Sequence, residues 1–202
     1  MPNNVRVVKG TVVVEDTFSE AELGQLVGRH RSRTAFELRR TRHTSLAFLT
    51  DLPAIESLSL VSVKVGDARA LSQVGTLRTL FLNGITPGAG WDFLADLVQI
   101  HHLHILNTRG ELALPDLSGL DQLTSFRAWG CRGLDDVSIL SGAPRLEEVE
   151  LVDTGLTPEQ LVPLLEKPSV RYLSSSFRRR QDAELFQQYL DRAGKKAHRE
   201  AT

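Results

Sequence analysis

Apolar residues recur along this chain at a nearly constant interval of 22 to 24 residues. Within each unit three apolar positions are spaced three and then two residues apart, as in Leu77, Leu80 and Leu82. The middle positions of seven successive units are Phe36, Leu58, Leu80, Leu103, Phe126, Val149 and Leu173. Alternation of apolar and polar residues predicts a short strand with one buried face. Its repetition at this period predicts a solenoid of stacked units.

The repeat is similar to that of leucine-rich-repeat proteins, and specifically resembles the small, free-standing arrays of bacteria. In that family each unit is a strand followed by a short helix or 3-10 segment, and the units stack into a curved horseshoe. The resemblance implies an α/β leucine-rich-repeat solenoid with a parallel concave sheet of about seven strands and short helices on the convex side. The Asn or Cys that often follows the strand in this family occurs here only as Cys131, so an asparagine ladder is not expected.

We expect one structural domain in three parts. Residues 1–32 should form an N-terminal cap from a Val-rich strand or hairpin and a helix, which begins near Ser19 with capping-box spacing to Glu22. Residues 33–177 carry the repeats, and residues 178–202 should form a capping helix and a frayed tail. Caps are needed because an open solenoid exposes apolar core and an unpaired strand edge at each end.

The residues that alternate with the buried ones should point to the concave face, because successive side chains of a strand face opposite ways. Nine of them are candidates for partner binding: Phe81, His102, His104, Leu106, Arg127, Trp129, Glu148, Glu150 and Tyr172. Exposed apolar clusters mark binding patches, and Trp and Arg often carry binding energy. We therefore predict a partner site on the concave sheet. Self-association as a homo-oligomer and local packing of these side chains are the alternatives.

Charge narrows the choice of partner. The formal net charge is −1, but residues 111–170 carry eleven acidic and four basic groups, whereas residues 1–50 carry five acidic and eight basic groups. An acidic patch favours a protein partner with a basic surface, and it argues against a general nucleic-acid binder. The basic ends leave an RNA-binding role as the alternative from another class.

The sequence contains no recognisable set of catalytic, cofactor-binding or metal-binding residues, so we expect no enzyme, no cofactor and no metal site. His102 and His104 should project to the same face, but a third ligand is missing. Gly88-Ala89-Gly90 lacks the remaining residues of a phosphate-binding loop. Cys131 occupies a buried column, which favours a structural role over a nucleophile.

The sequence contains neither a signal-peptide pattern nor a membrane span, from which we expect a cytoplasmic protein. The resemblance to leucine-rich-repeat proteins implies protein recognition. Our hypothesis is a bacterial immunity protein, an inhibitor that neutralises a toxin by covering a basic cleft with Trp129, Glu148 and Glu150. A scaffold or adaptor in signalling or assembly is the alternative within the same class.

Overall fold

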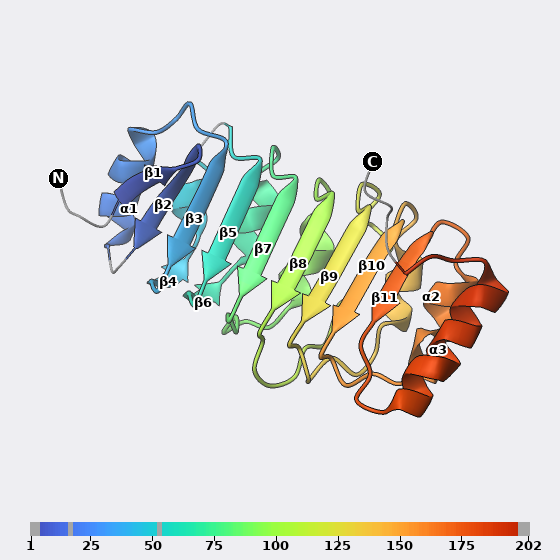
Figure 1. Cartoon of the computed structure of the whole chain (residues 1–202). Coiled ribbons are helices and arrows are strands. Elements are labelled where there is room, and N and C mark those ends of the chain that lie inside the picture. Colours follow the sequence, from blue (N-terminus) through green and yellow to red (C-terminus); the bar gives the residue numbers. More distant parts are fainter. Residues whose placement is uncertain (1–4, 16–17, 52–53, 198–202) are drawn as a thin grey trace.

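A sheet of nine strands forms the body of the computed structural model, which describes residues 5–15, 18–51 and 54–197 (Figure 1). In spatial order the strands are β1 (Val5–Val8), β2 (Thr11–Glu15), β3 (Ala35–Arg39), β5 (Ser57–Val61), β7 (Thr79–Asn83), β8 (His102–Leu106), β9 (Ser125–Trp129), β10 (Glu148–Val152) and β11 (Tyr172–Ser175). Neighbouring strands are parallel except for β1 and β2. A second sheet pairs β4 (Arg42–Ser45) with β6 (Lys64–Asp67).

The repeat strands pair in the register that the sequence period predicts. From β5 to β11 the middle apolar positions lie opposite one another as Leu58, Leu80, Leu103, Phe126, Val149 and Leu173. Each of these side chains is at most 1% exposed. Burial of one such side chain contributes about 1.5–3 kcal/mol. The row is therefore a continuous core that holds successive units together.

The sheet has nine strands instead of the expected seven because an N-terminal hairpin joins it. Strand β2 pairs in parallel with β3, with Val14 opposite Leu38, and β1 folds back antiparallel onto β2. The turn between β1 and β2 holds Lys9 at φ 47° and Gly10 at φ 88°. Two successive residues with positive φ are typical of the tight turns that suit the twist of a hairpin.

One turn geometry closes every repeat strand from β3 to β10. Two residues after the last buried position of the strand, the backbone adopts a left-handed conformation with φ between 50° and 65° at Arg40, Ser62, Gly84, Asn107, Gly130 and Asp153. In most of these turns the amide N–H donates to the last carbonyl of the next strand, as from Ser62 to Asn83 at 2.7 Å. The left-handed residue thus turns the chain away from the sheet without losing a sheet hydrogen bond.

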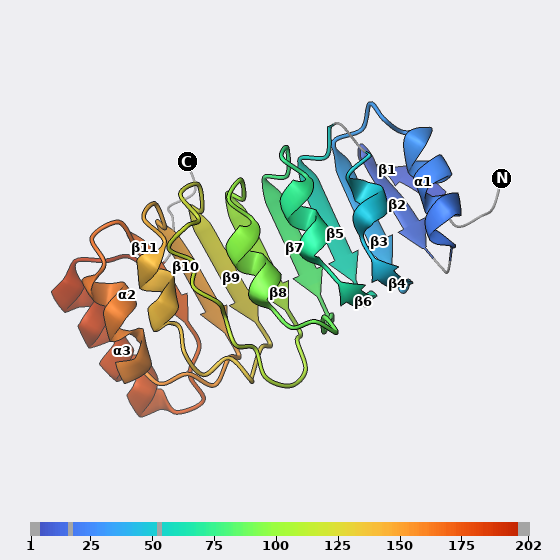
Figure 2. The same ribbon diagram turned by 180° about the vertical axis from the view of Figure 1, so that it is seen from behind.

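Short helices cover one face of the sheet, and the other face stays open (Figures 1 and 2). These helices are α1 (Glu20–Gly28), η1 (Ala47–Leu49), η2 (Arg69–Gln73), η3 (Asp92–Asp96), η4 (Ser138–Gly142), η5 (Glu159–Leu161) and α2 (Val162–Glu166). The longer α3 (Arg180–Ala193) lies at the C-terminal end of the sheet (Figure 1). Between β8 and β9 no helix forms, and the loop buries Leu112, Leu117 and Leu120 instead. We call the uncovered side the open face; it is the side that the sequence predicts to be concave.

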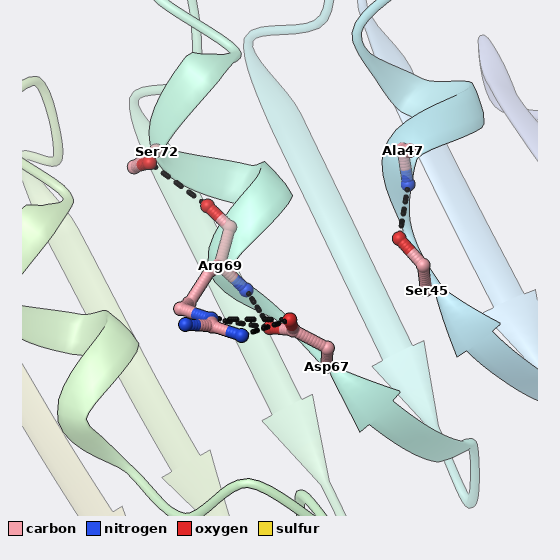
Figure 3. A network of polar contacts seen from close by, with 5 residues as sticks. All are labelled: Ser45, Ala47, Asp67, Arg69 and Ser72. Atoms are coloured by element: carbon pink, nitrogen blue, oxygen red, sulfur yellow. Dashed lines mark hydrogen bonds and ion pairs between the residues drawn. The ribbon is translucent and has the colours of Figure 1, made fainter.

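Side chains at equivalent positions fix where the 3-10 helices begin (Figure 3). The Ser45 hydroxyl accepts a hydrogen bond from the Ala47 N–H at 3.1 Å, and one unit later the Asp67 carboxylate accepts one from the Arg69 N–H at 2.9 Å. The Arg69 guanidinium also bonds the Asp67 carboxylate, at 2.7 Å, and these bonds lower the pKa of Asp67. A short polar side chain thus satisfies an N–H that the helix itself leaves unpaired.

The two ends of the sheet differ. At the N-terminal end the expected capping box is present, because Ser19 and Glu22 exchange hydrogen bonds between side chain and backbone. At the C-terminal end the Leu173 N–H donates to the carbonyl of Lys196, and the Lys196 N–H donates to Arg171, so the returning chain covers the outer edge of β11. The outer edge of β1 has no partner strand within the described residues. Parts of both expected caps, residues 1–4, 16–17 and 198–202, lie outside the described residues.

Candidate protein-binding surface

The nine candidate residues share the open face of five consecutive strands, β7 to β11. They alternate with buried positions such as Leu80 and Leu82, which fixes their direction. We call this set the open-face patch: Phe81, His102, His104, Leu106, Arg127, Trp129, Glu148, Glu150 and Tyr172. At about 4.8 Å between strands, four intervals give the patch a width of roughly 19 Å. A patch of this width is large enough to take part in a protein–protein interface.

Aromatic rings occupy the first part of the central row. Phe81 lies opposite His104, with ring centroids 6.0 Å apart, and His104 in turn lies opposite Arg127. Burial, with the positive charge of Arg127 as the second cause, lowers the pKa of His104 to about 4. The pKa of His102 is also lowered, chiefly by burial. Near neutral pH His104 therefore presents a neutral imidazole beside Phe81, so this part of the patch carries no charge of its own.

Arg127 is held between two carboxylates on the neighbouring strand. Its Nη2 donates a hydrogen bond to Oε1 of Glu148 at 3.0 Å, and its Nε lies 3.2 Å from Oε2 of Glu150. The second contact is an ion pair without hydrogen-bond alignment, since Nε has no acceptor in line with its hydrogen. Two carboxylates share one guanidinium, so the cluster keeps one negative charge in excess. The open-face patch is therefore acidic on its β10 side.

An apolar row runs beside this charged cluster. Trp129 lies opposite Leu106 on one side and Val152 on the other, and it is 39% exposed, whereas both neighbours are partly buried. Val152 was not among the nine candidates, although its place in the same column as Trp129 was a signal for it. Ser125 shares the column of His102 and Glu148 but is buried, because it is small and lies between two larger side chains.

Candidate chemistry elsewhere has a structural explanation in the described residues. Within them, no three His, Cys, Asp or Glu side chains converge on a point that could hold a metal ion. Cys131 is fully buried, and its Sγ donates to the carbonyl of Ile105 at 3.3 Å. Gly88 approaches the backbone of Gly66, where its N–H donates to Val65, so its segment packs along β6.

A polar groove of about 840 Å³ follows the turns beyond the C-terminal ends of the repeat strands from β5 to β10. Asn107 donates to the Asn83 side chain at 2.9 Å, and Arg132 pairs with Asp153 at 2.9 Å, so four of the polar side chains along this groove bind one another. No residue of the predicted site lines it.

Comparison with solved structures identifies the architecture. Internalin C2 from Listeria monocytogenes superposes with a TM-score of 0.56 at 22% identity, over 83% of this chain and 80% of that chain. A second internalin of the same organism, InlF, gives a TM-score of 0.51 at 14% identity, over 83% of this chain and 60% of that chain. Internalins are leucine-rich-repeat proteins. This chain has the leucine-rich-repeat fold.

The predicted solenoid of parallel strands and short helices is thereby confirmed. Both identities are below 25%, so the likeness concerns the leucine-rich-repeat fold alone. No protein-family model matches the sequence, and no curated protein matches it significantly. Across residues 5–15, 18–51 and 54–197, none of the helices has both the length and the apolar character to cross a membrane.

Proposed function

We propose that this leucine-rich-repeat chain is a non-enzymatic module that binds another protein through its open-face patch. Leucine-rich-repeat folds are typically binding domains, and a stack of repeats presents an extended, rigid surface. The observation that carries the proposal is Trp129, 39% exposed between Leu106 and Val152 and next to the Arg127 charge cluster. An exposed aromatic side chain with apolar neighbours and a charged rim is the composition of an energetic centre in protein interfaces.

The charges favour a partner with a basic surface. Glu148 and Glu150 share a single guanidinium, and residues 111–170 carry an excess of acidic groups. A complementary basic surface would be attracted over several ångströms and oriented before contact. This supports the finer proposal of an immunity-type inhibitor, which would neutralise a toxin by covering its basic cleft. A scaffold or adaptor would use the same surface without inhibiting its partner.

Affinity capture from a lysate of the source cell tests the surface. Wild-type chain is compared with Trp129→Ala on the open face and with Val98→Ala, a control that changes an exposed apolar side chain away from it. For a captured protein we expect Trp129→Ala to weaken binding about tenfold or more, as for an interface centre, and Val98→Ala to leave it unchanged. A partner bound equally well by all three chains would refute the open-face proposal.

The identity of the captured molecule then separates the finer roles. An enzyme or toxin whose activity falls on addition of one equivalent of the chain supports the inhibitor role. A partner that keeps its activity supports the scaffold. Recovery of RNA, with affinity that decreases steeply between low and high salt, would instead support the basic ends as a nucleic-acid contact.

A further inference from the structure

A recess of about 280 Å³ lies where the C-terminal helix α3 rises beside the open face. One wall comes from the outward positions of β10 and β11, and the opposite wall comes from α3. Apolar side chains provide much of the lining: Val152, Phe177, Ala183, Phe186 and Leu190. The rings of Phe177 and Phe186 lie 5.2 Å apart, and Phe186 and Leu190 are 5% and 1% exposed, so this lining is firmly packed.

Glu150 adds a carboxylate to this apolar recess. It belongs both to the recess and to the Arg127 cluster, where its contact with Nε of Arg127 is an ion pair without hydrogen-bond alignment. An ionised carboxylate can accept about four hydrogen bonds. Glu150 therefore keeps acceptor capacity for a second donor, and the cluster keeps its excess negative charge.

A hydroxyl from the neighbouring strand accompanies this carboxylate. Ser174 lies opposite Glu150 in the pairing of β10 with β11, so both side chains are on the open-face side of the sheet. Ser174 and Ser176 both line the recess. Ser175 lies opposite the buried Leu151, so its hydroxyl faces the core and takes no part in the recess.

We propose that this recess binds a lysine or arginine side chain of the protein partner, an inference that rests on the proposed function. Such side chains combine an aliphatic stem with a cationic head, and they bury the stem against apolar surface while the head seeks a polar partner. Val152 and Phe177, which are only partly buried, match the stem, and the carboxylate of Glu150 matches the head. An uncharged apolar side chain would leave Glu150 without its cation, and an acidic one would be repelled.

The test uses the whole chain and a small probe, so it does not depend on finding the partner. Nα-acetyl-lysine methylamide is titrated into ¹⁵N-labelled protein and followed by amide NMR spectra. We expect saturable shifts, with a dissociation constant on the order of millimolar, confined to β10, β11 and α3. The same probe acetylated on Nε keeps the stem but loses the charge, and it should bind at least about tenfold more weakly.

Two variants locate the site, and their dispersed amide spectra report that they remain folded. Glu150→Gln removes the charge, and Ala183→Leu narrows the recess from α3 with a residue that favours helix. Both should abolish saturation, whereas Glu166→Gln, an exposed glutamate of α2, should leave it unchanged. Absence of saturable shifts, equal shifts with the acetylated probe, or binding that survives Glu150→Gln would each overturn the proposal.

The proposal and the broader function can fail separately. Loss of probe binding with retained, Trp129-dependent partner capture would remove the cation site and leave the open-face module intact. Probe binding without any Trp129-dependent partner would support the recess as a site for basic side chains while removing the open-face proposal.

Discussion

The guanidinium of Arg127 donates a hydrogen bond from Nη2 to Oε1 of Glu148 at 3.0 Å, across the boundary between β9 and β10. Glu150 approaches the same guanidinium at Nε. The two glutamates face the same way on one strand, and the positive charge of Arg127 offsets the repulsion between their carboxylates. The charges of the open-face patch are thus organised by one side chain.

Replacement of this arginine should therefore cost stability. We expect Arg127→Met, which keeps much of the aliphatic volume, to lower the free energy of unfolding in urea by about 1 kcal/mol. The difference from wild type should shrink in 1 M salt, where exposed charges are screened. Arg132→Met is the control, because Arg132 and Asp153 are more exposed, at 66% and 45%, and we expect a clearly smaller loss of stability there. Equal losses at the two sites would contradict a special role for Arg127.

The lowered pKa of His104 predicts a pH-dependent stability. Its ordinary pKa is about 6.5, and in the folded chain it is about 4. Between these values the unfolded chain binds a proton that the folded chain does not. The contribution of His104 to the free energy of unfolding is therefore fully present above pH 6.5 and is lost as the pH falls toward 4. Allowing for partial exposure, we expect a loss of about 1–2 kcal/mol over this range.

Urea unfolding of wild type and His104→Gln at several pH values between 4 and 7 isolates this contribution from that of the carboxylates. The free energy of unfolding of wild type, minus that of His104→Gln, should decrease as the pH falls from 6.5 toward 4. An NMR titration of the His104 ring gives the pKa directly, and a midpoint near 6.5 would show that the imidazole is solvated.

Gly133 has no room for a side chain. A Cβ placed on it would lie 1.9 Å from the carbonyl oxygen of Gly110 and 3.0 Å from Cα of Glu111, and both are backbone atoms that cannot rotate away. We expect Gly133→Ala to destabilise the fold by about 2 kcal/mol or more. Gly75→Ala should change stability by no more than about 0.5 kcal/mol, since a Cβ there meets nothing within 4 Å. Similar thermal midpoints for the two variants would refute the close approach.

Thr154 is a buried residue whose hydroxyl group is unpaired among the described residues. It is 1% exposed, and its Oγ1 has no hydrogen-bond partner among the described residues. Thr154→Val should therefore raise the free energy of unfolding by about 1 kcal/mol, because the buried polar atom is removed at nearly constant shape. Thr41 occupies the equivalent position, but its Oγ1 lies 2.9 Å from Nε2 of His43. Thr41→Val should lower stability in the same urea assay, and the opposite signs make the pair a stringent test.

The sequence period was enough to predict the repeat strands and their register. Positions such as Leu80 and Leu103 are required to be apolar by the stacking of units, so the pattern survives in every unit. The turn after each strand was not foreseen. Only two of its six left-handed residues are glycine, at Gly84 and Gly130, and a residue such as Arg40 carries no sequence signal for positive φ.

The candidate site followed from alternation along the strands, which places side chains on a face but does not pair them. That Arg127 lies between Glu148 and Glu150 depends on rotamers, and the alternation leaves those undetermined. The recess beside α3 could not be predicted from the sequence, for another reason. Its walls join β10 to α3 through Glu150 and Phe186, and a helical stripe does not say how far the helix rises over the sheet edge.

The unequal ends of the sheet give the array a direction. The chain around Lys196 already occupies the edge of β11, whereas β1 presents free backbone groups at its outer edge within the described residues. A strand donated by another molecule could pair beside Val7 without displacing hydrogen bonds among the described residues. Among the described residues, the sheet can therefore be extended by strand pairing at β1, whereas the chain around Lys196 blocks such pairing at β11.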